Sequence, residues 1–352
     1  MKKGLGAYIS LLFLQRLLII LFALVTLLSV LDSLANADNL PPGLGMLGQL
    51  RYMGLRLPIL FDRALLISIL MAVLLTYVSL SRRNEMVALS ASGMSIFGQI
   101  KLLIPTVFIT GALCAFAINQ LSPPSSRSLQ TWLGTKALQT DDATPQKLWL
   151  SDENRLVELE EVKGNELFGV TIFNRDDQGF IVSVTTAPSA SAASGGWRLK
   201  DPTQRRFDTE AVTGDLTFWP SPQTPDSLRD LILPPRDMGF RTLLALSEMR
   251  DSGSRPSGAY ILWALNRLFV PITAIGFLIL GTAIMQVYGR RANADLAAAA
   301  GVAIGFVYLV IDGIMKTLAE NGSLDPVMTI VLPNLVLILA GLWLALEREA
   351  RR

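Results

Sequence analysis

The chain has 352 residues, of which 51% are hydrophobic and only 17% charged, whereas roughly a quarter of the residues of a soluble domain are charged. It has no histidine and a single cysteine, Cys114. This composition excludes Ser-His-Asp and Cys-His catalysis, His-containing zinc sites and an internal disulfide. We expect a membrane protein that performs no covalent chemistry of its own, binds no metal and has no nucleic-acid partner.

Long runs without charge recur along the chain, and each approaches the roughly 20 residues that a helix needs to cross the hydrocarbon of a membrane. Such runs exceed what the buried helices of a soluble core use. No small-residue cleavage site closes the first run before Asp32, which favours a retained span over a signal peptide. We predict a polytopic α-helical membrane protein with six transmembrane helices, over residues 17–31, 64–81, 102–118, 268–285, 296–311 and 327–346.

Lysine and arginine are distributed unevenly over the connections between these spans. One side carries Lys2, Lys3, Arg16, Arg82, Arg83, Lys101, Arg290, Arg291, Arg348, Arg351 and Arg352. The other side carries Arg51, Arg56, Arg63 and Lys316. Because the richer side is usually cytoplasmic, we expect both termini in the cytoplasm of a bacterial inner-membrane protein and the long third connection in the periplasm.

That long connection differs in composition from the spans and predicts a separate domain. After a stretch rich in Ser and Pro at 122–126, strand-like runs alternate with turn signals. The runs cover 147–150, 155–161, 167–173, 180–186, 197–200 and 216–219. We expect three parts: residues 1–120 with three spans, residues 121–257 as an antiparallel β-domain of the sandwich type that ends in a short amphipathic helix at 240–249, and residues 258–352 with three more spans.

The chain offers no convincing nucleotide-binding loop. The G-x-G-x-x-G match at 43–48 follows two prolines in a predicted outer loop, whereas a dinucleotide fingerprint needs a strand before it and a helix after it. There is no Walker A pattern. If ATP drives this protein, ATP and Mg²⁺ must be bound by another subunit.

Two features of the fifth span allow alternative interpretations. Gly301 and Gly305 form a G-x-x-x-G motif, which indicates either ordinary helix packing or a moving, subunit-facing helix. Asp312 and Lys316 are one helical turn apart, either at a solvated helix end or as a polar lining for a lipid headgroup. No charge is predicted deeper in any span, which disfavours an ion-coupled carrier.

The cytoplasmic connection at 81–94 is the most informative stretch. Residues 85–92 are compatible with a short amphipathic helix in which Met86 and Leu89 share a face, and Gly93 is a typical helix-ending residue. The helix either lies on the membrane surface or docks a cytoplasmic partner.

The run Arg-Asn-Glu-Met-Val-Ala-Leu-Ser-Ala-Ser-Gly-Met at 83–94 resembles the coupling-helix signature of the LptF/LptG permeases, the membrane subunits of the lipopolysaccharide-exporting ABC transporter. Weaker fragments follow in the same order and spacing, at 162–164, 169–173, 197–199, 305–308 and 332–334. The resemblance covers essentially the whole chain. The segments at 30–34 and 83–94 are more similar to the LptG type than to the LptF type.

The resemblance implies a heterodimer with an LptF-type paralogue, an LptB-type ATPase dimer in the cytoplasm, and transfer of lipopolysaccharide through a periplasmic β-jellyroll to LptC and an LptA-type bridge. It further implies ATPase-coupling residues on the short helix and lipid-binding residues at the outer rim of a cavity. The coupling candidates are Arg83, Glu85, Met86, Leu89, Ala91 and Gly93. The lipid-binding candidates are Asp32, Arg56, Arg63, Asp312 and Lys316, with Asp32 standing where no basic residue is nearby.

The leading hypothesis is therefore a permease subunit, not an enzyme, that extracts lipopolysaccharide with energy from a partner. The alternative is a non-transporting membrane scaffold whose β-domain recruits periplasmic proteins. An ATPase that copurifies with the chain would distinguish the two.

Overall fold

The computed structural model describes residues 2–37, 45–133, 148–152, 155–163, 165–176, 178, 180–206, 217–221, 228, 231, 233–248, 255–288, 293–350. The chain forms two compact units. The helical unit comprises Met1–Asp32, Leu57–Leu121 and Ile261–Arg352, and the β-sheet unit comprises Ser33–Arg56 and Ser122–Tyr260.

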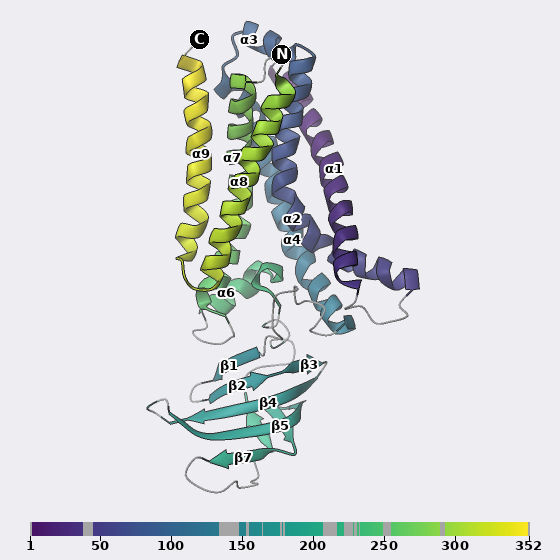
Figure 1. The fold of residues 1–352 in the computed structure, drawn as a ribbon, viewed down its shortest axis with the longest axis vertical. Coiled ribbons are helices and arrows are strands. Elements are labelled where there is room, and N and C mark those ends of the chain that lie inside the picture. Colours follow the sequence, from purple (N-terminus) through teal and green to yellow (C-terminus); the bar gives the residue numbers. More distant parts are fainter. Residues whose placement is uncertain are drawn as a thin grey trace. The chain divides into compact units, whose positions relative to one another are not determined.

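Long apolar helices dominate the chain (Figure 1). They are α1 (Lys2–Ala35), α2 (Gly45–Arg82), α4 (Ile96–Leu133), α7 (Ser257–Tyr288), α8 (Ala294–Glu320) and α9 (Pro326–Ala350), with the short α3 (Glu85–Ala91) between α2 and α4. Among the described residues, 6 helices are long and apolar enough to cross a membrane. The six predicted spans are confirmed, but each helix continues beyond its charge-free run, so Arg51, Arg56 and Arg63 lie on α2 and not in a loop.

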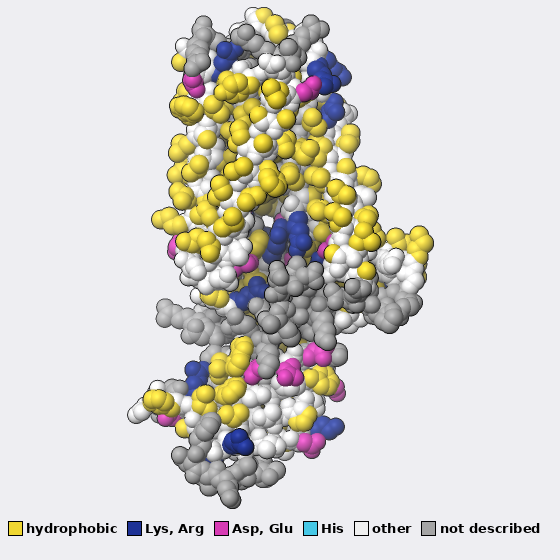
Figure 2. Space-filling model, in the orientation of Figure 1, with side chains coloured by type: hydrophobic (Ala, Val, Ile, Leu, Met, Phe, Trp, Pro, Cys, Tyr) yellow, Lys and Arg dark blue, Asp and Glu magenta, His cyan; other side chains and the backbone are white. Residues whose placement is uncertain are grey.

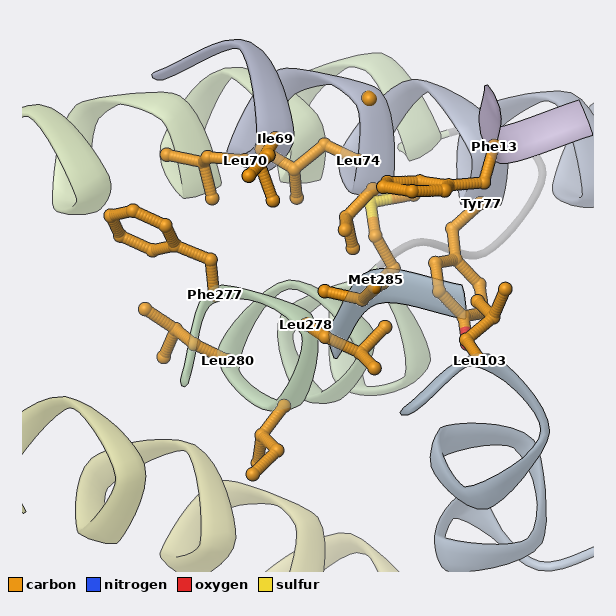
Figure 3. Close-up of a cluster of buried hydrophobic side chains, with 14 of the residues drawn as sticks. Phe13, Ile69, Leu70, Leu74, Tyr77, Leu103, Phe277, Leu278, Leu280 and Met285 are labelled. Atoms are coloured by element: carbon orange, nitrogen blue, oxygen red, sulfur yellow. The ribbon is translucent and has the colours of Figure 1, made fainter. Parts of the chain in front are cut away.

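Two helices form the centre of the helical unit. In their most apolar segments, 72% of α2 and 78% of α7 is buried, against 22–33% for α1, α4, α8 and α9. Figure 3 shows side chains of α1, α2, α4 and α7 meeting in this core, including Phe13, Leu70, Tyr77, Leu103 and Phe277. The face of the unit seen in Figure 2 is largely hydrophobic between charged ends, and many large apolar side chains of the outer helices are exposed. This distribution suits a bundle surrounded by lipid.

Close helix contacts in this core require small residues. A Cβ on Gly341 of α9 would lie 2.8 Å from the backbone nitrogen of Leu280 on α7, and one on Gly111 of α4 would lie 3.1 Å from the Cα of Pro271. Small residues let membrane helices approach to such distances, where packing replaces the hydrophobic effect as the driving force.

The β-sheet unit contains one antiparallel sheet. Its strands are β1 (Leu148–Asp152), β2 (Arg155–Leu159), β3 (Glu161–Lys163), β4 (Glu166–Arg175), β5 (Ile181–Ala193), β6 (Gly196–Lys200), β7 (Thr203–Arg206) and β8 (Phe218–Pro220). The order is β1-β2-β4-β5-β6-β8, with β3 also paired to β4 and β7 to β5. The sheet therefore forks at both long strands, and Trp197 and Trp219 are buried in its core.

The antiparallel β-domain between the third and fourth spans is confirmed. The pattern missed β3 and β7 because both are short and polar, and it ended β5 too early because its second half is rich in Ser and Ala. The predicted amphipathic helix is confirmed as α6 (Phe240–Glu248), whose Leu243 is buried.

The predicted boundary at 120–121 falls inside a helix. The stretch rich in Ser and Pro, expected to open the β-domain, continues α4 as far as Leu133. Ser122, Ser126 and Leu129 are buried on one face of this extension. Tertiary packing of that face outweighs the helix-breaking tendency of Pro123 and Pro124.

Candidate functional site

The short helix α3 is delimited by two residues with positive φ. Asn84, at φ 60°, ends the turn after α2, and Gly93, at φ 77°, follows α3. The Met94 amide donates a hydrogen bond back to the Leu89 carbonyl at 3.2 Å, which closes the helix in the manner of a Schellman cap. The predicted helix and the role of Gly93 as its end are confirmed.

The apolar face of α3 points into the helical unit. Met86 and Leu89 are 8% and 7% exposed and belong to the same core cluster as α2, α4 and α7. These two residues therefore hold the helix on the bundle and do not present a contact surface to a partner.

The opposite face of α3 is open. Val87 is 67% exposed, and Ala88 and Ala91 are exposed beside it. Arg82 and Arg83 flank this face, and both are exposed. The sequence pattern did not single out Val87, although its place one residue after the inward-facing Met86 puts it on the other side of a helix. A small apolar face bordered by cations is a surface suited to another protein.

Polar contacts connect the N-terminal end of α3, and the turn before it, to distant parts of the chain. The Tyr8 hydroxyl of α1 donates to Glu85 Oε1 at 3.2 Å and accepts from Arg83 at 3.4 Å. Arg82 forms an ion pair with Asp295, in the first turn of α8, at 2.8 Å. A displacement of α3 therefore acts directly on α1 through Glu85, whereas the ion pair of Arg82 joins the end of α2 to α8. Figure 1 places α3 at the same end of the helical unit as the N- and C-termini.

The small residues of α8 face α2 within this chain. A Cβ on Gly305 would lie 1.9 Å from Leu70 Cδ2, and one on Gly301 would lie 2.7 Å from Leu74 Cδ2. Both glycines are buried. The G-x-x-x-G motif thus serves packing inside the chain, on a helix whose other residues Ile304, Phe306 and Val307 are exposed.

At the other end of α8, Asp312 and Lys316 form an ion pair of 2.6 Å. Their side chains are only 9% and 14% exposed. The pair is therefore not a solvated helix end, which removes one of the two interpretations left open by the sequence. Within the pair, the carboxylate neutralises the ammonium group that the resemblance assigns to a phosphate.

A further cation, Arg267 of α7, lies near Lys316 along the axis of the helical unit. Trp263 of α7 donates its indole N–H to Glu320 of α8, and the rings of Phe277 and Tyr308 meet edge to face at 5.3 Å. These contacts fix the antiparallel register of the two helices and place Arg267 at a height similar to that of Lys316. Arg267 is 9% exposed and lies ten residues after the start of α7, whereas the predicted fourth span began only at 268.

The remaining candidates are less clustered. Asp32 is half-buried near the end of α1, Arg63 is exposed on α2, and Arg56 is 8% exposed. Asp32 and Arg63 belong to the helical unit and Arg56 to the β-sheet unit. Of the five lipid-binding candidates, Asp312 and Lys316 form an ion pair with each other.

The described residues contain no group of three or more His, Cys, Asp or Glu that could hold a metal ion. The last four residues of the G-x-G-x-x-G match open α2 at Gly45, and its first two residues lie outside the described part of the chain.

Comparison with known proteins agrees with these features. A model of the family described as "Lipopolysaccharide export system permease LptF/LptG" matches residues 7–347. The chain is 26% identical over 291 residues to the lipopolysaccharide export system permease protein LptG of Escherichia coli K12, with 80% of each chain covered. It is 22% identical over 308 residues to LptG of Haemophilus influenzae, covering 83% of this chain and 84% of the relative. The similarity to LptG proteins confirms the type expected from the sequence.

Proposed function

Since the chain belongs to the LptF/LptG family of lipopolysaccharide export system permeases, we propose that it is the LptG-type membrane subunit of an ABC transporter that extracts lipopolysaccharide from the inner membrane. Its energy comes from a separate cytoplasmic ATPase dimer of the LptB type. An LptF-type paralogue completes the membrane part, and LptC with an LptA-type bridge receives the lipid.

The observation that carries this proposal is the geometry of α3. The helix is held on the bundle by Met86 and Leu89, leaves Val87 exposed and is tied to α1 through Tyr8. A helix that is rigidly attached on one face and open on the other suits transmission of a partner's movement. ATP binding in the partner then shifts the membrane helices between two arrangements, because the nucleotide binds one arrangement more tightly.

The proposed orientation places α3 and both termini in the cytoplasm and the β-sheet unit in the periplasm. It rests on the unequal numbers of basic residues on the two sides, read with the positive-inside tendency. In this orientation the charged groups at the end of α8 lie at the outer surface, where lipopolysaccharide phosphates are exposed.

The lipid-binding part of the proposal assigns Lys316 and Arg267 to phosphate groups, with Arg56 and Arg63 as further candidates on α2. Phosphate is a strong partner for such cations, and exposed apolar side chains on α1 and α8 suit acyl chains. Because Asp312 already neutralises Lys316, a phosphate must compete with that carboxylate.

A double-variant cycle separates the structural role of this pair from a lipid role. We expect Lys316→Met to lower the thermal stability of the purified protein, since it leaves Asp312 buried without its cation, a loss worth about 3–5 kcal/mol in soluble proteins. We expect Lys316→Met combined with Asp312→Leu to regain stability while lipopolysaccharide release in vesicles stays low. Full release by the stable double variant would contradict a role for Lys316 in lipid binding.

Copurification tests the transporter against the scaffold. We expect the tagged chain, extracted from its native membrane in mild detergent, to carry an ATPase and a second permease-like chain in fixed proportion. The complex should hydrolyse ATP, and lipopolysaccharide should change the rate. A chain that purifies with periplasmic proteins alone, and with no ATPase under any mild detergent, would favour the scaffold.

A further inference from the structure

About five turns of α2 precede its charge-free membrane span. The helix has 38 residues, which at 1.5 Å per residue makes about 57 Å, whereas a hydrocarbon layer of about 30 Å needs about 20 residues. The charge-free run that crosses the membrane begins only at Ala64, after Asp62 and Arg63. Residues 45–63 therefore precede the span while belonging to the same helix, and Pro58, inside that helix, allows a bend between the first part and the span.

One face of this segment is covered by the end of α4. Tyr52 is 1% exposed, and the Ser125 hydroxyl of α4 donates to the Leu55 carbonyl at 2.7 Å. The guanidinium group of Arg51 lies 4.6 Å from the centre of the Trp132 ring. These contacts fix the rotation of the segment about its own axis.

The other face is apolar and uncovered. Met46 is 78% exposed, Leu47 83% and Leu50 55%, and Leu57, at 44%, continues the same stripe two turns later. Large apolar side chains at these spacings share one side of a helix. Gln49 and Arg51 flank the stripe with polar groups, and both are exposed.

We propose that residues 45–57 lie along the membrane surface, with Met46, Leu47 and Leu50 inserted at the boundary between headgroups and acyl chains. The bilayer is the occupant that fits, because the same helix enters it a few residues further on. The flanking chemistry agrees, since tryptophan and arginine are typical of the membrane–water interface and the cation of Arg51 suits anionic headgroups. The segment then sets the depth at which α2 enters the leaflet.

Site-directed spin labelling of the full chain tests this placement. In a Cys114→Ala background, single-cysteine variants Leu47→Cys and Leu50→Cys carry a nitroxide, and the protein is reconstituted in vesicles of phosphatidylethanolamine and phosphatidylglycerol. Power saturation then compares collisions with oxygen, which concentrates in lipid, and with a water-soluble nickel chelate. Leu335→Cys on the exposed face of α9 is the hydrocarbon reference, and Gln178→Cys in the β-sheet unit is the aqueous reference.

We expect oxygen to exceed nickel collisions at positions 47 and 50, as at 335, with the order reversed at 178. Gln49→Cys, one residue from Leu50 on the polar flank, should show a clear shift toward nickel. Nickel accessibility at 47 and 50 equal to that at 178 would mean that the face is in water and would overturn the proposal. So would immobilised labels that neither reagent reaches, because they would mean that a protein covers this face.

Discussion

Replacing Val87 with Asp is expected to weaken the association of the chain with the proposed ATPase partner strongly while leaving the chain itself folded. Val87 is 67% exposed at the centre of the open face of α3, so the substitution removes no internal contact. In a complex, the new carboxylate would be buried against the partner without a counter-charge. Central interface positions cost about 2 kcal/mol or more when disrupted, which corresponds to about 30-fold weaker binding. The measurement is the amount of ATPase that copurifies per mole of the chain.

The matched control adds the same charge at the opposite end of the bundle. Ser323, in the turn between α8 and α9, is exposed, and Ser323→Asp should copurify the ATPase normally. Met86→Ala gives a second comparison. It removes a buried contact between α3 and the rest of the bundle, so it should lower the thermal stability as well as the coupling of ATP hydrolysis to lipid release. Normal ATPase binding and transport by Val87→Asp would disprove the docking assignment.

Replacing Gly305 with Leu is expected to destabilise the helical unit strongly. Even a Cβ at this position would lie 1.9 Å from Leu70 Cδ2, so a leucine forces α8 away from α2. Overpacking of a core typically costs about 1–3 kcal/mol and occasionally more. We expect a lower unfolding temperature in detergent and poor recovery of the purified protein.

Gly313 is the matched control on the same helix, since a Cβ there meets nothing within 4 Å. Gly313→Leu should leave stability unchanged or slightly raised, because leucine favours helix over glycine by less than about 1 kcal/mol. Adding Leu70→Ala to Gly305→Leu should restore part of the loss by providing space. Equal effects of the two glycine substitutions would show that Gly305 does not lie at a close helix contact.

The spans and the short helix α3 were predictable because their signals are local. A charge-free run predicts a membrane helix by itself, and Gly93 predicts the end of α3 because glycine readily adopts the positive φ found there. The extension of α4 to Leu133 was not predictable, because Pro123 and Pro124 argue locally against a helix that tertiary packing maintains.

The partners of the charged residues also required the structure. The spacing of Asp312 and Lys316 suggested a pair, but only the fold shows that it is shielded from solvent. The predicted fourth span began at 268, after Arg267, because the apolar run before Arg267, from Ala259 to Leu265, is too short to predict a membrane helix. Likewise, the outward direction of Val87 depends on which face of α3 the bundle covers.

The position of α3 in the chain has a mechanical consequence. It joins α2, one of the two most buried helices, to α4, the least buried one. Because a close-packed core transmits displacement and does not absorb it, force applied to α3 cannot bend α4 alone. The force must also rotate α2, together with the helices that pack against α2. We therefore expect the core of the helical unit to stay packed while α3 and α2 move together. The largest displacements should then occur in α1 and α8, which are mostly outside that core.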